Sequence, residues 1–216
     1  MSKPFSFPWN RVKPFKFYGF AMLFVRVVGN ILYKIRVVGR ENLPESASGV
    51  ILACNHLRSI DPALLMLATR LRWRFMAKAE LFQSKLTALL YTHCNAFPVD
   101  RETVDCRALN FALAALEQGG YGLGIFPEGT RSPDGVPHEA KAGVAMFARR
   151  TKADILPCSI YHDGPLKFRT MLTIRIGPVI PFAELGLGEA PNKRQNHAAC
   201  EKIMAAITEL WKKGHD

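Results

Sequence analysis

The sequence predicts an α/β fold with a largely parallel central sheet of about seven strands flanked by helices. Short apolar runs alternate with helical patterns along most of the chain, and the links between them are short. The chain has 216 residues, of which 49% are hydrophobic, so it can fill the core of one domain. We therefore expect one such domain over 34–216, preceded by a distinct segment over 1–33.

The predicted strands are short runs rich in β-branched and apolar residues. They cover 34–38, 50–54, 72–77, 96–99, 122–126, 155–160 and 172–176. Helical patterns follow at 62–70, 84–93, 103–118 and 139–151, and a last one covers 192–213. In this last helix Ile203, Ile207 and Trp211 recur at helical spacing, so we assign them to core packing.

The first 33 residues predict an amphipathic helix that lies in a membrane interface. Residues 17–33 are almost wholly apolar, but the run is shorter than the roughly 20 residues of a span, and no small-residue cleavage site follows. One helical stripe collects Lys16, Gly19, Arg26, Asn30 and Lys34. The aromatic surface comes from Phe15, Phe17, Tyr18, Phe20 and Phe24. A helix docked on the core, or a short span with an internal arginine, would also fit this pattern.

The charge balance favours anionic ligands or surfaces. Lys plus Arg outnumber Asp plus Glu by 29 to 18, which gives a formal charge of +11. The basic residues are interspersed rather than gathered in a run, which argues against a nucleic-acid-binding module. The five cysteines are scattered and form no C-x-x-C pair, so we expect neither a disulfide framework nor a zinc site.

The stretch CNHLRSID places a histidine and an aspartate just after the predicted strand 50–54. In an α/β sheet the functional crevice lies beyond the carboxyl ends of the strands, so His56 is a candidate catalytic residue. Asp61 precedes Pro62, which is typical of a helix N-cap. The four-residue connection also allows the Asp61 carboxylate to accept a hydrogen bond from one imidazole nitrogen, which leaves the other as a base. Asn55 either shapes this loop or supports an oxyanion.

A second group of charged residues follows the predicted strand 122–126 in the stretch FPEGTRS. Arg131 at such a strand end suits a phosphate, because a guanidinium donates two parallel hydrogen bonds. An ordinary ion pair between Glu128 and Arg131 is the alternative. In NAFPVDR, Arg101 follows another strand, and it could share one anion with Arg131. Lys78 is either a third donor or a solvated side chain.

These stretches resemble the four sequence blocks of the lysophosphatidic acid acyltransferase family. NHLRSID resembles the family's N-H-x-x-x-x-D signature, and FPEGTRS resembles its F-P-E-G-T-R-S block. NAFPVDR and ILPCSI, which contains Pro157, resemble the other two, and all four occur in the family's order over roughly 34–180. One departure is Asn95, where the family usually has Gly; Asn tolerates a left-handed backbone best among the other residues.

The resemblance implies a membrane-associated enzyme that moves an acyl group from acyl-CoA or acyl-carrier protein to the sn-2 hydroxyl of 1-acyl-sn-glycerol-3-phosphate, giving phosphatidic acid. It implies no metal and no cofactor, with acyl-CoA or acyl-carrier protein as the co-substrate. Together with the N-terminal segment and the basic charge, this chemistry predicts a peripheral or monotopic location at the cytoplasmic face. His56 would be the general base and Asp61 would orient it. The acceptor would be bound by the block Glu128, Gly129, Thr130 and Arg131, with Arg101 and Lys78. Another lysolipid, such as lyso-ornithine lipid, is an alternative acceptor.

Two other chemistries remain open from the residues alone. Cys54 and His56 would project on the same face of a continuing strand, so Cys54 could form an acyl-enzyme with His56 as its base. A metal-dependent phosphoesterase could use His56, Asp61 and Glu128, although the sequence shows no paired histidines of the kind that metal sites often use.

Overall fold

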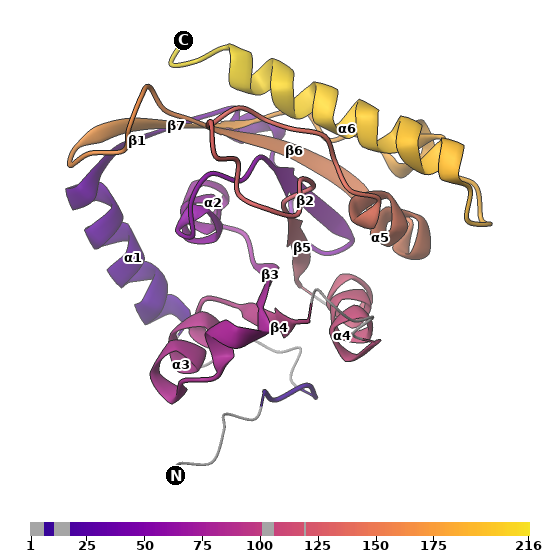
Figure 1. Ribbon diagram of the computed structural model, residues 1–216, viewed down its shortest axis with the longest axis horizontal. Helices are drawn as coiled ribbons and strands as arrows, with labels where there is room; N and C mark the ends of the chain where they lie inside the picture. The colour runs from indigo at the N-terminus through magenta and orange to yellow at the C-terminus, as the bar shows by residue number, and fades with distance from the viewer. Residues whose placement is uncertain (1–6, 11–17, 101–105, 119) are drawn as a thin grey trace.

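The chain folds around one seven-stranded sheet flanked by helices (Figure 1). The computed structural model describes residues 7–10, 18–100, 106–118 and 120–216. Across the sheet the strand order is β1-β7-β6-β2-β5-β3-β4. The strands are β1 (Tyr33–Val38), β2 (Val50–Cys54), β3 (Trp73–Lys78), β4 (Ala96–Val99), β5 (Gly122–Ile125), β6 (Asp154–Tyr161) and β7 (Thr170–Ile176). All seven predicted strands are present, so the predicted fold class is confirmed.

The sheet is parallel except at one pair of neighbours. β2 pairs in parallel with β5 and β6, β3 with β4 and β5, and β1 with β7. β6 and β7 are antiparallel, because the connection 162–169 is too short for the crossover that parallel strands require. The β6–β7 hairpin therefore turns at the edge where β2 and β5 also end.

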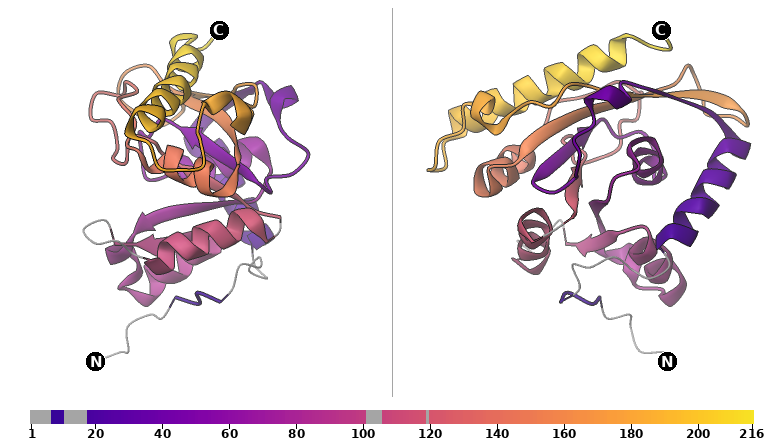
Figure 2. Two further views of the ribbon diagram at one scale, coloured as in Figure 1. Left: turned by 90° about the vertical axis from the view of Figure 1, so that its right-hand side faces the viewer. Right: turned by 180° about the vertical axis from the view of Figure 1, so that it is seen from behind.

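Helices cover both faces of the sheet (Figures 1 and 2). They are α1 (Tyr18–Leu32), α2 (Asp61–Thr69), α3 (Lys85–His93), α4 (Cys106–Glu117), α5 (Gly143–Thr151) and α6 (Lys193–Lys212), with short 3₁₀ turns η1 (Arg40–Asn42), η2 (Ala79–Phe82) and η3 (Phe182–Leu185). Helix α2 lies against one face, with α1 packed on it, and α4, α5 and α6 cover the other. Ile203 and Ile207 of α6 are fully buried, which confirms their predicted packing role.

Strand β2 is buried on both faces, as expected for a central strand between two helical layers. Ile51 and Ala53 face the layer of α4, α5 and α6, whereas Leu52 and Cys54 face α2. Packing on both sides fixes the direction in which this strand ends. The loop that carries His56 therefore starts from a rigid support.

Helix α5 begins later than the sequence predicts, at Gly143 rather than at residue 139. Two backbone donors in this stretch bind the loop after β5 instead of starting a helix: His138 N–H donates to the Glu128 carboxylate, and Lys141 N–H donates to the Pro127 carbonyl. The preceding helix, α4, starts at Cys106, and the predicted residues 103–105 lie outside the described residues.

Helix α1 forms where the sequence predicts the N-terminal amphipathic helix. Arg26 and Asn30 of the predicted polar stripe are exposed, and Leu23, Val27 and Ile31 are also 57%, 50% and 56% exposed. Within the described ranges, no helix combines the length and the hydropathy needed to cross a bilayer. Of the predicted stripe and aromatic surface, Phe15, Lys16 and Phe17 lie outside the described residues, as do the side chains of Tyr18, Phe20 and Phe24.

Candidate active site

The predicted hydrogen bond between His56 and Asp61 is present. The distance from His56 Nδ1 to Asp61 Oδ2 is 2.8 Å, and Asp61 is 1% exposed. Backbone N–H groups of Leu57 and Arg58 donate to the same oxygen, each at 2.7 Å. A buried carboxylate requires such compensation. The Nδ1 proton is thereby directed at Asp61, and Nε2 has no hydrogen-bond partner in the described part of the chain.

The prediction that Asp61 caps helix α2 is wrong. Asp61 is the first residue of the helix and Ile60 precedes it as N-cap, without a side-chain hydrogen bond. The Asp61 carboxylate points back to the loop, where three donors contact one of its oxygens. Pro62 lies in the first turn, where its missing N–H leaves no hydrogen bond unmade.

An aromatic ring packs against one face of the imidazole. The ring of Phe126 stacks on His56 with centroids 3.9 Å apart and an interplanar angle of 16°. The ring of Phe75 in turn packs near that of Phe126, with centroids 5.8 Å apart. Gly124 leaves room for Phe75, since a Cβ there would lie 2.1 Å from its Cε1. We did not predict a role for Phe126, and its position at the end of a strand just before Pro127 was the available signal.

Glu128 fixes the backbone of the His56 loop. Its Oε2 accepts a hydrogen bond from His56 N–H and its Oε1 accepts one from His138 N–H, both at 2.9 Å. Burial raises the pKa of the Glu128 carboxyl above its usual value, and the two N–H donors oppose that shift. On the other side, Ser132 N–H donates to the His56 carbonyl at 2.7 Å. The alternative of a Glu128–Arg131 ion pair is wrong, because the Arg131 guanidinium donates to Ser59 Oγ at 3.1 Å instead.

Asn55 shapes the loop, which answers one question that the sequence left open. Its Nδ2 donates to the Ile160 carbonyl at 3.0 Å, and its Oδ1 accepts from Ile160 N–H at 2.9 Å. The side chain is fully buried and completes the pairing between the end of β2 and β6. Both ends of the amide are therefore bound to the backbone of β6.

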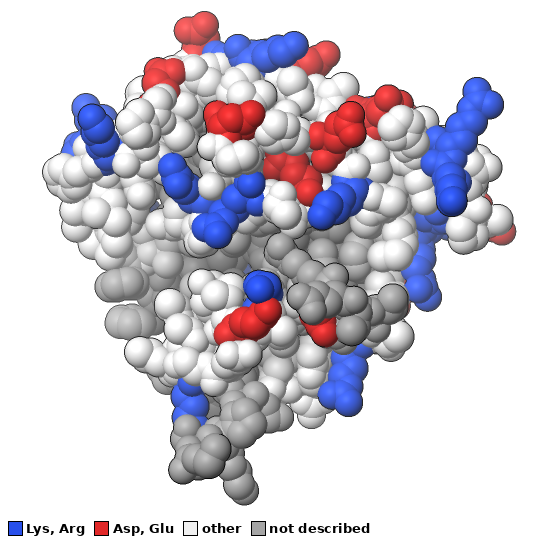
Figure 3. Space-filling model, viewed as in Figure 1, with Lys and Arg blue, Asp and Glu red and all other residues white. Residues whose placement is uncertain are grey.

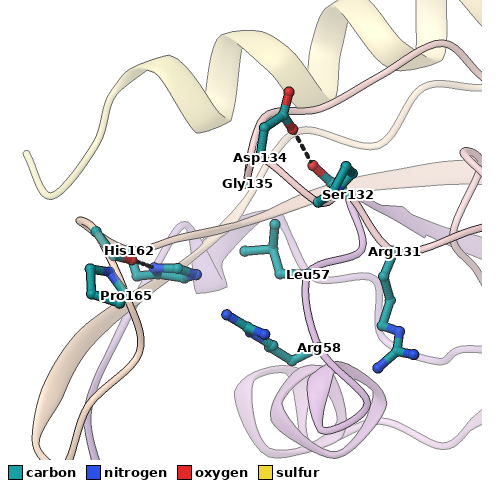
Figure 4. Close-up of a pocket in the computed structure, with 10 residues that line it drawn as sticks. Leu57, Arg58, Arg131, Ser132, Asp134, Gly135, His162 and Pro165 are labelled. Carbon is teal, nitrogen blue, oxygen red and sulfur yellow. Dashed lines mark hydrogen bonds between the residues drawn. The ribbon is translucent and has the colours of Figure 1, made fainter.

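A cavity of about 460 Å³ lies at the carboxyl edge of the sheet beside this loop (Figure 4). Arg58 after β2, Arg131 after β5 and His162 after β6 all line it. Asp134 also lines it, but its Oδ1 accepts from Ser132 Oγ and from the Val136 N–H, and it contacts His138 Nε2 at 2.8 Å. These bonds hold the pKa of the Asp134 carboxyl well below its usual range. We predicted Arg131 here and missed Arg58 and His162.

The structure does not place two other predicted site residues, Arg101 and Lys78, at the cavity. Arg101 lies outside the described residues, so its convergence with Arg131 stays a prediction. Lys78 Nζ lies 2.7 Å from Glu80 Oε1 at the end of β3, and Lys78 does not line the cavity. The role of Lys78 as a third phosphate donor therefore stays a prediction.

The backbone between Glu128 and Arg131 makes a tight turn. Gly129 has a φ of +72°, and the side chain of Lys141 crosses it so closely that a Cβ would lie 2.9 Å from Lys141 Cδ. Thr130 is exposed. Asn95, the predicted departure from glycine in another block, has a φ of 58°, which confirms its left-handed conformation.

The metal-dependent alternative finds no ligand set in the ranges that the structure describes. No three His, Cys, Asp or Glu side chains are grouped there so that they could hold a metal ion. Asp61 and Glu128 direct their oxygens at backbone N–H groups of the His56 loop instead. Their arrangement builds a support for His56 rather than a coordination sphere.

The covalent alternative requires a thiolate at Cys54, and the surroundings of Cys54 disfavour one. The side chain is fully buried, and burial raises the pKa of the thiol well above its usual value. Its Sγ lies 3.6 Å from Asn55 Oδ1. A neutral, enclosed thiol is a poor nucleophile.

We expect Cys54→Ala to retain most of the wild-type kcat, because the structure gives Cys54 a packing role. The loss of one buried sulfur should lower the free energy of unfolding by about 1 kcal/mol. Steady-state kinetics with any accepted donor, alongside thermal unfolding, checks both values. Near-complete loss of activity in a normally folded variant would restore the covalent route.

Comparison with known proteins places the chain among acyltransferases. The family model described as Acyltransferase matches residues 34–161. A 1-acyl-sn-glycerol-3-phosphate acyltransferase of Bacillus subtilis is 30% identical over 202 residues, which cover 91% of this chain and 98% of that protein. An enzyme of the same name from Streptococcus pneumoniae is 29% identical over 62% of this chain and 48% of its own length.

A solved structure shares the fold. The crystal structure of the 1-acyl-sn-glycerophosphate acyltransferase PlsC from Thermotoga maritima superimposes with a TM-score of 0.69, covering 89% of this chain and 79% of that one at 24% identity. The matched family model begins within β1 and ends at the last residue of β6, so it includes the His56 loop and the FPEGTRS turn, whereas His162 of the cavity lies just beyond it. The chain therefore belongs to the acyltransferase family, together with these 1-acyl-sn-glycerol-3-phosphate acyltransferases.

Proposed function

We propose that this enzyme transfers a fatty acyl group from acyl-CoA or acyl-carrier protein to the sn-2 hydroxyl of 1-acyl-sn-glycerol-3-phosphate. The observation that carries the proposal is the hydrogen bond between the partly exposed His56 and the buried Asp61, 2.8 Å long, beside a cavity lined by two arginines. The names of the relatives support the choice of acceptor. Acyl transfer needs a base for the hydroxyl and a cation that binds the phosphate, and we assign these roles to His56 and to Arg131.

The residues suggest a direct transfer. His56 Nε2 accepts the hydroxyl proton as the acceptor oxygen attacks the thioester carbonyl carbon. The C–S bond then breaks, and the imidazolium returns its proton to the departing sulfur. Because a thiol has a pKa of about 8.5, its thiolate leaves without a strong acid. Asp61 stabilises the imidazolium that forms between these steps.

Arg131, with the predicted Arg101, holds the phosphate of the acceptor in this mechanism. Positioning of this kind turns a reaction between separate molecules into one within a complex, and it can supply a large share of the rate enhancement. Glu128 contributes indirectly, because it fixes the backbone N–H of His56. We assign Gly129 and Thr130 to the turn that presents Arg131.

An acyl-transfer assay over a panel of lysolipids tests the proposal. The panel contains lysophosphatidate, lysophosphatidylglycerol and lyso-ornithine lipid, each with acyl-CoA and with acyl-carrier protein. We expect the highest kcat/KM for lysophosphatidate with at least one donor. A preference for lyso-ornithine lipid would change the acceptor, and absence of transfer to every lysolipid would contradict the proposed reaction.

The same proposal places the enzyme at the cytoplasmic face of a membrane as a peripheral or monotopic protein. Leu23, Val27 and Ile31 form an exposed stripe along α1 at four-residue spacing, next to the exposed Arg26. Such a helix buries its apolar stripe at the boundary between headgroups and acyl chains, with its cation near lipid phosphates. The acceptor would then reach the enzyme from the bilayer.

We expect the triple variant Leu23→Ser, Val27→Ser, Ile31→Ser to bind vesicles containing anionic lipid at least about tenfold more weakly, because three apolar side chains no longer leave water. Vesicle co-sedimentation measures the change. The variant Val136→Ser, which removes an exposed apolar side chain from a loop, is the matched control. Unchanged partitioning of the triple variant would exclude α1 as the contact.

A further inference from the structure

Two polar groups that line the cavity have no protein partner in the described ranges. One is the guanidinium of Arg58, and the other is Nε2 of His162. The proposed mechanism assigns a role to Arg131 but none to Arg58 or His162. Figure 4 shows Arg58 between the other two, with Arg131 on one side and His162 on the opposite side.

His162 is held in one orientation by the β6–β7 hairpin. Its Nδ1 lies 2.9 Å from the Gly164 carbonyl oxygen, so Nδ1 carries a proton and donates it. The ring points from the hairpin toward Leu57 and Arg58 (Figure 4). Nε2 is therefore directed at the cavity, where it can accept a hydrogen bond when neutral or donate one when protonated.

Arg58 is positioned by the catalytic loop itself. Its backbone N–H donates to Asp61 Oδ2, the oxygen that also contacts His56. The side chain is exposed and lines the cavity. A ligand that engages Arg58 would thus lie within two residues of the proposed base.

The charge around the cavity favours an anion. Figure 3 shows basic and acidic side chains interspersed over the face seen in Figure 1. Inside the cavity, however, Arg58 and Arg131 stand against one carboxylate, Asp134, whose Oδ1 already meets three groups of its own loop. A volume of about 460 Å³ is within the range of small-molecule sites and exceeds what a lone phosphate fills.

We propose that Arg58 and His162 complete, with Arg131, a subsite for a phosphate monoester. The two guanidinium groups supply charge and paired donors. The second ionisation of a monoester has a pKa near 6, so the complex can keep one proton, and that proton joins a phosphate oxygen to His162 Nε2 whichever of the two carries it. A phosphodiester has no such proton, and its singly charged group matches the two arginines less well. The subsite therefore favours monoesters over diesters.

Both substrates of the proposed reaction can supply this chemistry, and the inference rests on that reaction for its biological role. Lysophosphatidate has a phosphate monoester at sn-3. CoA has one at its 3′ position, whereas the prosthetic group of acyl-carrier protein has only a diester. The source is therefore distinguishable with ligands that differ only in the monoester.

Binding to the full chain, measured by titration calorimetry, tests the subsite without requiring catalysis. The probes are a short-chain lysophosphatidate that is soluble as a monomer, CoA and 3′-dephospho-CoA. We expect Arg58→Gln and His162→Asn each to raise the Kd of one monoester probe about tenfold, a change of about 1.4 kcal/mol. An effect on lysophosphatidate assigns the subsite to the acceptor, and an effect on CoA with none on 3′-dephospho-CoA assigns it to the donor.

The controls separate the subsite from general effects of charge and folding. In His162→Asn the amide nitrogen can still donate to Gly164 while the group at the Nε2 position is lost, whereas His162→Gln restores a polar group there and should recover part of the affinity. Arg150→Gln removes an exposed arginine of α5 outside the cavity and should leave every Kd unchanged. Equal affinities in wild type, Arg58→Gln and His162→Asn, or no binding of either monoester by wild type, overturn the proposal. Transfer activity in the lysolipid panel remains a separate result.

Discussion

His56→Ala is expected to lower kcat by about 10²- to 10⁴-fold, the usual contribution of a positioned general base. The acceptor hydroxyl would then have to lose its proton to water during the attack. KM for the acceptor should change little, because the phosphate contacts of Arg131 remain. The measurement is acyl transfer with lysophosphatidate at saturating donor, with thermal unfolding of the same preparations.

A second variant keeps this test independent of folding. His56 stacks on Phe126, so alanine leaves a gap against that ring, whereas His56→Gln fills more of the space and lacks the base. Both variants should lose activity to a similar extent. A folded variant of either kind that turns over lysolipid as fast as the wild type would exclude His56 as the base and, with it, the proposed mechanism.

The strands and the order of the motifs could be predicted because they depend on residues that are close together in the sequence. Val50 to Cys54 is an uninterrupted apolar run, and the structure buries it on both faces. The pairing of His56 with Asp61 could also be predicted, since only four residues connect them. Their short connection leaves few ways for a buried carboxylate to be satisfied.

The supports of the site could not be predicted, because they come from distant parts of the chain. Glu128 binds the backbone of His56 across 72 positions, and nothing local distinguishes this role from an ion pair with Arg131. His162 reaches the cavity only because β6 and β7 form a hairpin at the carboxyl edge of β2. A local rule also failed at Asp61. The following proline predicted that Asp61 caps the helix, but its carboxylate accepts hydrogen bonds from three donors of the preceding loop instead.

The two substitutions Asp61→Asn and Asp61→Ala should separate the charge of this carboxylate from its hydrogen bonds. All three donors converge on one oxygen, Oδ2. An asparagine carbonyl in that place can accept the same three bonds, so Asp61→Asn should fold normally and keep the imidazole oriented. It removes only the charge that stabilises the imidazolium, an attraction of up to about 4 kcal/mol at an effective dielectric constant near 20, so we expect kcat to fall about 10²-fold.

Asp61→Ala should lower both the stability and kcat more than Asp61→Asn does. It leaves the N–H groups of Leu57 and Arg58 and the His56 Nδ1 proton without their acceptor, so we expect the free energy of unfolding to fall by about 3 kcal/mol or more. Without its acceptor the imidazole can rotate or change tautomer, so kcat should fall further than in Asp61→Asn. Denaturant unfolding and single-turnover acyl transfer on both variants provide the comparison. If the asparagine variant is as unstable as the alanine variant, the three bonds do not share one oxygen in solution; if it is as active as wild type, the charge of Asp61 plays no part in the reaction and the carboxylate serves only to shape the loop.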